Sequence, residues 1–182
     1  MTPKFCFTAS IFLIHNGKVL LIKHKKLNMW LGPGGHIDEN ELPHLAAERE
    51  FFEETGLRVK VYSAYKKLSI SSKDDRFFHP LPFAINEHWV CKENYDRRLL
   101  AEKNKAEFAP ETKWPKGCEK HLNFTYLAKL IGPLEINPAE GESQEIAWFS
   151  LEDLKGKAKK GLMEDIFKEL LKAFELAKSS HS

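Results

Sequence analysis

The stretch from Gly34 to Leu57, GGHIDENELPHLAAEREFFEETGL, decides the fold of this chain. It places Glu50, Glu53 and Glu54 directly after a glycine-rich turn. On a helix, which advances about 100° per residue, Glu50 and Glu54 lie one turn apart with Glu53 beside them. Three carboxylates on one face repel and raise each other's pKa, so we expect a cation among them. For ligands that are all oxygen, the natural cation is Mg²⁺ or Mn²⁺.

The spacing within this stretch matches the motif of a known family. The matching positions are Gly35, Glu41, Arg49-Glu50, Phe51, Glu53-Glu54, Gly56 and Leu57. They fit the Nudix box in order, with Phe51 where the family usually has an aliphatic residue. Several fixed identities, each with a background frequency of roughly 5–10%, make a chance match improbable. The chain therefore resembles the Nudix hydrolases, in their broad MutT-like class.

The resemblance implies a role for each box carboxylate. Glu50 and Glu54 are expected to be the principal metal ligands, and Glu53 a ligand or a bridge between ions. A backbone carbonyl near Gly35 is expected to complete the metal site. Glu53 and Glu54 are also candidates for catalysis, because a box glutamate can be the general base in this family. The alternative for each acid is a solvated position on a surface helix. The match of the whole motif favours the metal site over this alternative.

Other acids have different expected roles. The family resemblance implies that Glu41 and Arg49 pair and brace the loop against the helix. A general base can also come from a distant loop, and Glu142 is our candidate, with Glu145 and then Glu119 as alternatives. For each of these three, a surface role is the competing interpretation.

A few residues are candidates for substrate contacts. His36 or His121 could touch a phosphate, and Phe83 or Trp89 could stack on a base. A neutral, hydrogen-bonded histidine and an aromatic ring packed in the core are the competing interpretations. The basic run Lys23–Lys26 is either a solvated strand end or a rim that faces phosphate.

Composition bounds the class of protein. A chain of 182 residues can bury a sizeable core, and we expect one domain over residues 1–182. The hydrophobic fraction of 42% and charged fraction of 30% are typical of a soluble globular protein. A net charge of +2 argues against nucleic acid as a partner but is compatible with an anionic small molecule. No apolar run reaches transmembrane length, so we expect no membrane partner.

The cysteines and the N-terminus bear on location. Cys6, Cys91 and Cys118 are irregularly spaced and form no CxxC pair, so the sequence predicts neither a zinc site nor a disulfide framework. This pattern favours a reducing compartment, and we expect a cytoplasmic protein. We interpret Phe5–Ile14 as a buried strand. A signal peptide is the alternative, but a cleavage site is missing and a hairpin signal follows directly.

The box helix has clear predicted ends. Pro43 is favoured in a first turn, and Gly56 can end a helix in the left-handed conformation. Its apolar side chains fall on two flanks, Leu45 with Phe52 and Ala47 with Phe51. We therefore expect this helix to be packed on both flanks and to present its acids to a cleft.

Local signals place the other elements. Asn16-Gly17 predicts a hairpin between Phe5–Ile14 and Val19–Lys23. The prolines of His79–Phe83 favour a loop or an edge strand. The remaining predictions are strands at Leu57–Tyr62, His121–Ile131 and Ala147–Phe149, a turn at Ser69–Asp75, and helices at Arg97–Lys105, from a Ser150 cap through Leu154, and at Met163–Ala177.

Mixed strands and helices in this order predict an α/β fold. The resemblance refines this to a Nudix-type α/β/α sandwich around a mixed sheet. Residues 92–120 are charged and irregular, and we expect them to form an insertion. The oligomeric state stays open, and a homodimer is compatible with the sequence.

The resemblance implies a metal-dependent hydrolase that cleaves a phosphoanhydride bond in a nucleoside diphosphate linked to another group. A nucleoside triphosphate or its oxidised form is the favoured substrate class, since no subfamily mark is complete. The alternative is a Nudix-fold module that binds a nucleotide or a partner without hydrolysis. Such modules usually lose a box glutamate, and this chain keeps all of them, which favours the enzyme.

Overall fold

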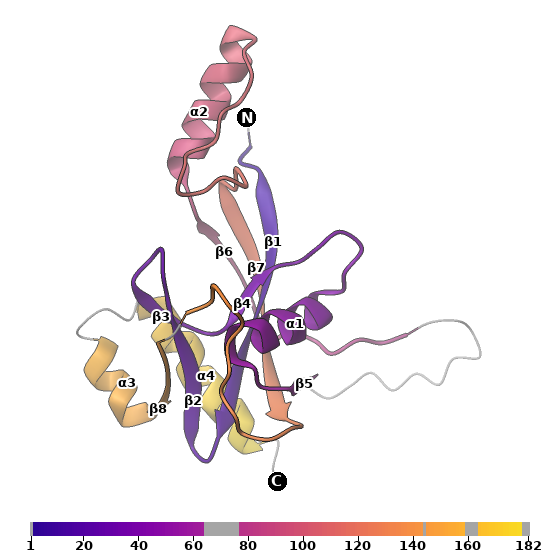
Figure 1. Cartoon of the computed structure of the whole chain (residues 1–182), viewed down its shortest axis with the longest axis vertical. Coiled ribbons are helices and arrows are strands. Elements are labelled where there is room, and N and C mark those ends of the chain that lie inside the picture. The colour runs from indigo at the N-terminus through magenta and orange to yellow at the C-terminus, as the bar shows by residue number, and fades with distance from the viewer. Residues whose placement is uncertain (1, 64–76, 144, 159–163, 180–182) are drawn as a thin grey trace.

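The computed structural model describes residues 2–63, 77–143, 145–158 and 164–179. Its elements, drawn in Figure 1, are β1 (Phe5–His15), β2 (Lys18–His24), β3 (Met29–Leu31), β4 (Gly34–His36), α1 (Pro43–Thr55), β5 (Val59–Tyr62), β6 (Ala84–Trp89), α2 (Lys92–Asn104), β7 (Lys120–Leu130), β8 (Ile146–Ser150), α3 (Leu151–Ala158) and α4 (Glu164–Ser179). Within these ranges, no helix is both long enough and apolar enough to span a bilayer.

The described strands form one mixed sheet. Its main path has the order β3-β2-β1-β7-β5, while β4 pairs with β1, β6 with β7 and β8 with β2. β1 and β7 run parallel, from Phe5 opposite Lys120 to Leu13 opposite Ala128. The other pairs are antiparallel. The strands that follow residue 111 therefore complete the same sheet that the N-terminal strands begin.

Helices cover both faces of the sheet, which gives the expected α/β/α sandwich (Figure 1). Alternate residues of β1 point to opposite faces. Ile11 and Leu13 pack toward α1, in a cluster with Ala47 and Phe51. Phe12 packs in the opposite cluster with side chains of α3 and α4. A central strand that is buried on both faces reads as a continuous apolar run, as β1 does.

The predicted hairpin and helix ends are confirmed. Asn16 and Gly17 both have positive φ, 48° and 73°, and Ile14 pairs with Val19 across the turn. α1 begins at Pro43 and is followed by Gly56 in the left-handed conformation at φ 75°. The strand predictions and the C-terminal helix are confirmed to within a few residues over the described ranges.

Two predictions on local structure need correction, and a third falls outside the described residues. α1 is not packed on both flanks, because Leu45 and Phe52 are 41% and 42% exposed. The helix after Ser150 extends beyond Leu154 to the end of α3. The predicted turn at Ser69–Asp75 lies outside the described residues.

The expected insertion is a helix with its own polar core. α2 starts five residues earlier than predicted and projects away from the sandwich (Figure 1). Asn94, fully buried, donates to the carbonyls of Trp114 and Cys118 and accepts from the Glu111 N–H. These bonds close the following loop onto α2.

Candidate active site

The box helix is held at its C-terminal end by a loop from far along the chain. Gly56 N–H donates to Phe52 O. A Cβ at Gly56 would overlap the backbone of Asn137, so the position requires glycine for space as well as for φ. Asn137 N–H donates to Thr55 O, and Ala139 N–H to Glu53 O. The segment before β8 therefore runs along the last turn of α1.

The glycine loop and the box acids are in direct contact. Gly34 N–H donates to Oε2 of Glu54 at 2.7 Å. Next to it, a Cβ at Gly35 would overlap the carboxyl group of Glu50. Both glycines lie in β4, which pairs with β1. The close approach of backbone to carboxylate places main-chain groups and two acids in one small space.

Arg49 joins the loop to the acidic face of the helix. Its Nε and Nη2 donate to the two oxygens of Glu41 at 2.9 and 2.8 Å, in a bidentate pair. Nη2 also donates to the His36 carbonyl at 2.9 Å. Nη1 donates to Oε1 of Glu50 at 2.9 Å and contacts Oε2 of Glu53 at 3.3 Å. One guanidinium thus links Glu41, the strand of the glycine loop and two box acids.

Glu50 and Glu54 are protonated more readily than free carboxyl groups, because their pKa values are raised. Burial raises the pKa of Glu54 to about 8, against the lowering effect of the Gly34 N–H. Burial also raises the pKa of Glu50, against the hydrogen bond from Arg49. Repulsion from neighbouring acids adds to both shifts but is smaller. The sequence predicted raised pKa values from repulsion, whereas burial in the fold is the leading cause.

This arrangement fits a divalent cation. Glu54 is partly buried, with one N–H donor and several acids around it, and no ion pair to a basic side chain is found for it among the described residues. Arg49 takes one oxygen each of Glu50 and Glu53, which leaves their other oxygens for a ligand. Carboxylate and carbonyl oxygens are the donors that Mg²⁺ and Mn²⁺ prefer.

Of the three distant acids, Glu142 lies near the box. Its charge contributes to the raised pKa values of both Glu50 and Glu54. Its N–H donates to Ala139 O, within the segment that contacts the end of α1. The loop that holds Glu142 is thereby anchored to the same helix as the box acids.

The alternatives Glu145 and Glu119 have other partners. Glu145 pairs with Lys23 at 3.1 Å. Glu119 is fully buried, pairs with Arg98 and accepts from the Lys4 N–H. Burial opposes the charge of Glu119, but the hydrogen bonds from Arg98 and Lys4 outweigh it and lower the pKa. The carboxylate of Glu119 thus binds Arg98 of the insertion, and its full burial contradicts the competing expectation of a surface position.

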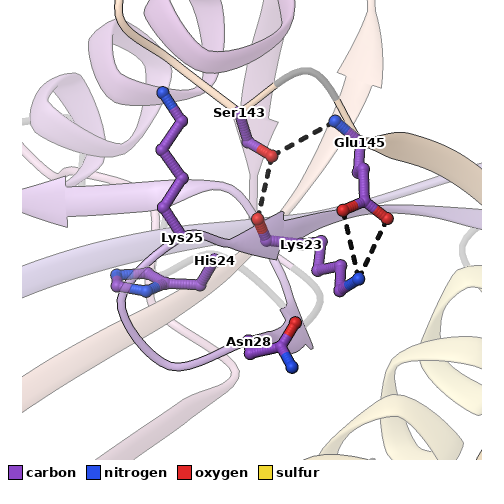
Figure 2. A pocket seen from close by; sticks show the side chains of 6 residues that line it. All are labelled: Lys23, His24, Lys25, Asn28, Ser143 and Glu145. Carbon is purple, nitrogen blue, oxygen red and sulfur yellow. Dashed lines mark hydrogen bonds and ion pairs between the residues drawn. The ribbon is translucent and has the colours of Figure 1, made fainter.

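A basic pocket of about 290 Å³ lies beside the Glu142 loop (Figure 2). It is lined by Lys23, His24, Lys25, Asn28, Ser143 and Glu145. Ser143 Oγ donates to the Lys23 carbonyl at 2.8 Å and accepts from the Glu145 N–H at 3.3 Å. The run Lys23–Lys26 is therefore partly built into a pocket wall. Lys25 reaches the Gly141 carbonyl, next to Glu142.

The histidines form a cluster of their own. His36 lies 3.3 Å from the sulfur of Cys118, and its ring meets that of His121 edge-on at 5.1 Å. Burial lowers the pKa of His36, and lowers that of His121 to about 3. His121 is therefore neutral at pH 7, which removes a charged contact to phosphate from its possible roles.

Two contacts join residues far apart in sequence. Phe83 is 9% exposed and packs against Phe12 in the core, an environment that agrees with the competing interpretation of core packing. Cys6 and Cys118 form a disulfide across 112 residues, contrary to the prediction of no disulfide. Neither contact has a signal in the local sequence, because both join segments that only the tertiary fold brings together.

Comparison with known proteins decides the family. The model of the NUDIX domain matches residues 4–111, which is more than half of the chain. The chain belongs to the NUDIX family. A crystal structure of a NUDIX-family hydrolase from Clostridium perfringens is similar with a TM-score of 0.70 and 29% identity, covering 94% of this chain and 97% of that one. The Nudix resemblance and the sandwich fold expected from the sequence are confirmed.

Curated relatives match over shorter segments. A putative 8-oxo-dGTP diphosphatase from Bacillus subtilis is 32% identical over 71 residues, 37% of this chain and 48% of that protein. A MutT-like protein from Streptomyces ambofaciens is 36% identical over 53 residues, 29% of this chain and 34% of that protein. The Nudix chain therefore spans about half, or less, of the length of these relatives.

Proposed function

We propose that this Nudix protein is a metal-dependent hydrolase that cleaves a phosphoanhydride bond in a nucleoside diphosphate linked to another group. The observation that carries the proposal is Glu54, a partly buried acid with a pKa of about 8 that contacts the glycine loop beside Glu50. An acid held away from water with no basic partner among the described residues has an energetic cost that a bound cation would remove. Clusters of this kind are typical of functional sites.

We assign Glu50, Glu53 and Glu54 as the residues that would hold Mg²⁺ or Mn²⁺, with the carbonyl of Gly35 as a further ligand. A bound divalent ion lowers the pKa of water and neutralises phosphate charge. Arg49 and Glu41 then brace the loop against α1 by their bidentate pair. This role explains why Arg49 contacts the His36 carbonyl as well as two box acids.

Glu142 is our candidate to accept the proton of the attacking water. Its position on a loop anchored to α1 supports this role, as does its effect on the pKa values of Glu50 and Glu54. Glu53 and Glu54 remain the alternative bases, since both belong to the same cluster. A general base must be within reach of the water that it activates, which Glu142 satisfies only if the water lies between the loop and the box.

The basic pocket supports a substrate with several phosphates. Lys23 and Lys25 contribute positive charge next to the loop of Glu142. Similarity to a putative 8-oxo-dGTP diphosphatase favours a nucleoside triphosphate or its oxidised form as the substrate class. His36 stays a candidate substrate contact, because it directly follows Gly35 in β4.

Residues 1–182 are proposed to act as one domain, because β7 and β8 complete the sheet begun by the matched residues 4–111. The cytoplasmic location stays a prediction. The Cys6–Cys118 disulfide counts against its premise that the cysteines form no disulfide framework.

The test is phosphate and pyrophosphate release with Mg²⁺, and separately Mn²⁺, across nucleoside triphosphates, oxidised nucleotides, ADP-ribose, NADH, dinucleoside polyphosphates and capped RNA. We expect turnover of a triphosphate class that excess chelator abolishes. Nucleotide binding without turnover of any compound would instead favour the alternative function, a Nudix-fold binding module.

A further inference from the structure

A second group of metal-ligating side chains lies outside the box. Cys6, His36 and Cys118 each offer one ligand atom, and these three atoms lie within 4.8 Å of one another. They come from β1, from β4 and from the end of the insertion before β7. Unlike the box, this group offers two sulfurs and an imidazole nitrogen, which are the donors of zinc sites.

We propose that the reduced chain binds a zinc ion through the thiolates of Cys6 and Cys118 and Nε2 of His36. The disulfide in the structure is the alternative, metal-free state of the same two sulfurs. The two states exclude each other, because the thiolate is the form of cysteine that binds the ion, and a sulfur in a disulfide is not a thiolate. The site is separate from the carboxylates that the proposed hydrolysis uses.

The distances are close to those that a tetrahedral zinc site needs. Bonds of about 2.3 Å to sulfur and about 2.0 Å to nitrogen place those two ligand atoms about 3.6 Å apart. His36 Nε2 and Cys118 Sγ are 3.3 Å apart in the structure. Two sulfurs on one ion would lie about 3.8 Å apart. Opening the disulfide therefore requires only a small separation of Cys6 from Cys118.

The sheet register fixes this geometry. Cys6 lies opposite His121 between β1 and β7, and His36 pairs with Thr8, two residues further along β1. Alternate residues share a face, so Cys6, Thr8 and the partners opposite them point to the same side. Backbone pairing therefore places Cys6 and His36, while Cys118 lies two residues before β7, where Asn94 donates to its carbonyl.

The surroundings contain an unsatisfied polar atom. Among the described residues, His121 Nε2 is buried and has no hydrogen-bond partner. Its ring meets His36 at 5.1 Å and His88 at 5.5 Å. Buried polar atoms in native proteins are normally paired, so this atom points to a ligand or water that belongs beside it. Solvent in the fourth position of the zinc site is such a partner.

Charge does not oppose the site. Lys26 and Lys116 lie near enough to act on His36. Two thiolates neutralise the charge of Zn²⁺, so the complex adds no net positive charge beside these lysines. A hard cation held by neutral ligands would be repelled at the same place.

The chemistry is balanced by an external reductant. A phosphine takes the oxygen of one water to become a phosphine oxide. Its two electrons, with the two protons of that water, convert the disulfide to two thiols. Zinc binding then releases both thiol protons to solvent.

The test uses the full chain, reduced with a phosphine, desalted under anaerobic conditions and titrated with Co²⁺ as a spectroscopic probe. Excess Mg²⁺ is present to occupy the box carboxylates. We expect a thiolate-to-cobalt charge-transfer band that saturates at one equivalent and disappears when Zn²⁺ is added. The same protein before reduction should show no band. This control carries no mutation, so it needs no separate check that a variant folds.

Cys91 provides a matched control. This third cysteine is buried and accepts the Asn94 N–H at the start of α2, a position where serine also serves. Cys91→Ser should keep the band, whereas Cys6→Ser should abolish it and His36→Ala should weaken Co²⁺ binding at least tenfold. Absence of the band in the reduced chain, or its persistence in Cys6→Ser, would overturn the proposal. Hydrolysis in Mg²⁺ is measured separately and its failure would not affect this result.

Discussion

The N–H of Gly34 donates to Oε2 of Glu54 across 2.7 Å, so the glycine loop and the last turn of the box helix are joined by a direct bond. These two residues lie 20 positions apart, one at the start of β4 and one near the end of α1. The bond holds a partly buried carboxylate whose pKa is raised to about 8, chiefly by desolvation. Since no basic side chain of the described residues pairs with this acid, the proposed cation has a defined position to enter.

Glu54→Gln should reduce turnover by about two orders of magnitude or more, because it removes charge from the proposed metal site. The amide oxygen still accepts the Gly34 N–H, so the fold should survive. Turnover is followed by phosphate or pyrophosphate release, and the fold by circular dichroism. An unchanged rate would remove Glu54 from the metal site.

Gly35→Ala should also reduce turnover strongly, because the added Cβ overlaps the Glu50 carboxyl group and displaces it. Gly156→Ala is the matched control, since a Cβ in α3 there meets no atom within 4 Å. That control should be stabilising by up to about 1 kcal/mol, as alanine is the better helix residue. Equal activities of the two variants would contradict the close approach at Gly35.

Arg49→Ala should lower stability as well as activity. It breaks the bidentate pair with Glu41 and leaves partly buried acids unpaired, which costs about 1–3 kcal/mol. Urea unfolding gives the free energy. The control is Lys60→Ala. It breaks the pair between Lys60 in β5 and Glu48 in α1, the helix that also holds Arg49, and should cost less than about 1 kcal/mol. Loss of activity alone in Arg49→Ala would identify it as a substrate contact.

The stability of the metal-free protein should fall as pH rises toward 8. The folded pKa of Glu54, about 8, is above its ordinary value of 4.5, so the folded state binds more protons than the unfolded state between these values. The free energy of unfolding then decreases with rising pH across that window. Thermal melts from pH 5 to 8.5 measure it. Added Mg²⁺ should stabilise more at pH 8 than at pH 5, because the ion competes with the proton.

Glu54→Gln provides the control for this pH dependence. Without the titrating carboxyl, the fall in stability across the window should become shallower. An identical pH profile in the variant and the parent protein would assign the effect to another group.

Glu142→Gln should lower kcat with little change in KM if this residue accepts the proton of water. Glu145→Gln, three residues further along the chain, removes the ion-pair partner of Lys23 in the basic pocket. We expect it to change KM and to leave kcat near that of the parent protein. Steady-state kinetics over a range of pH distinguish the two. Full activity of Glu142→Gln would move the general base to Glu53 or Glu54.

The residues of the box are sufficient to predict the helix and its acidic face. Pro43 and Gly56 set its ends through backbone preferences that act within a few residues. Asn16-Gly17 set the first hairpin for the same reason, since both residues tolerate positive φ. These features are local, and local sequence is sufficient for them.

The environment of each residue was decided by tertiary structure. The burial that raises the pKa of Glu54, the approach of the Glu142 loop to α1, and the meeting of Cys6 with Cys118 all need segments that are distant in sequence. The same is true of Phe83, whose aromatic character fits a core as well as a binding site.

The sequence by itself determined the family, the helix and the set of acids, because those depend on residue identity at fixed short spacing. Only the tertiary structure decided which acids are buried, which face of α1 is covered and which cysteines meet. The parallel pairing of β1 with β7 brings together residues more than 100 positions apart. No local periodicity encodes such a pairing, because its register is set by packing on both faces of the sheet.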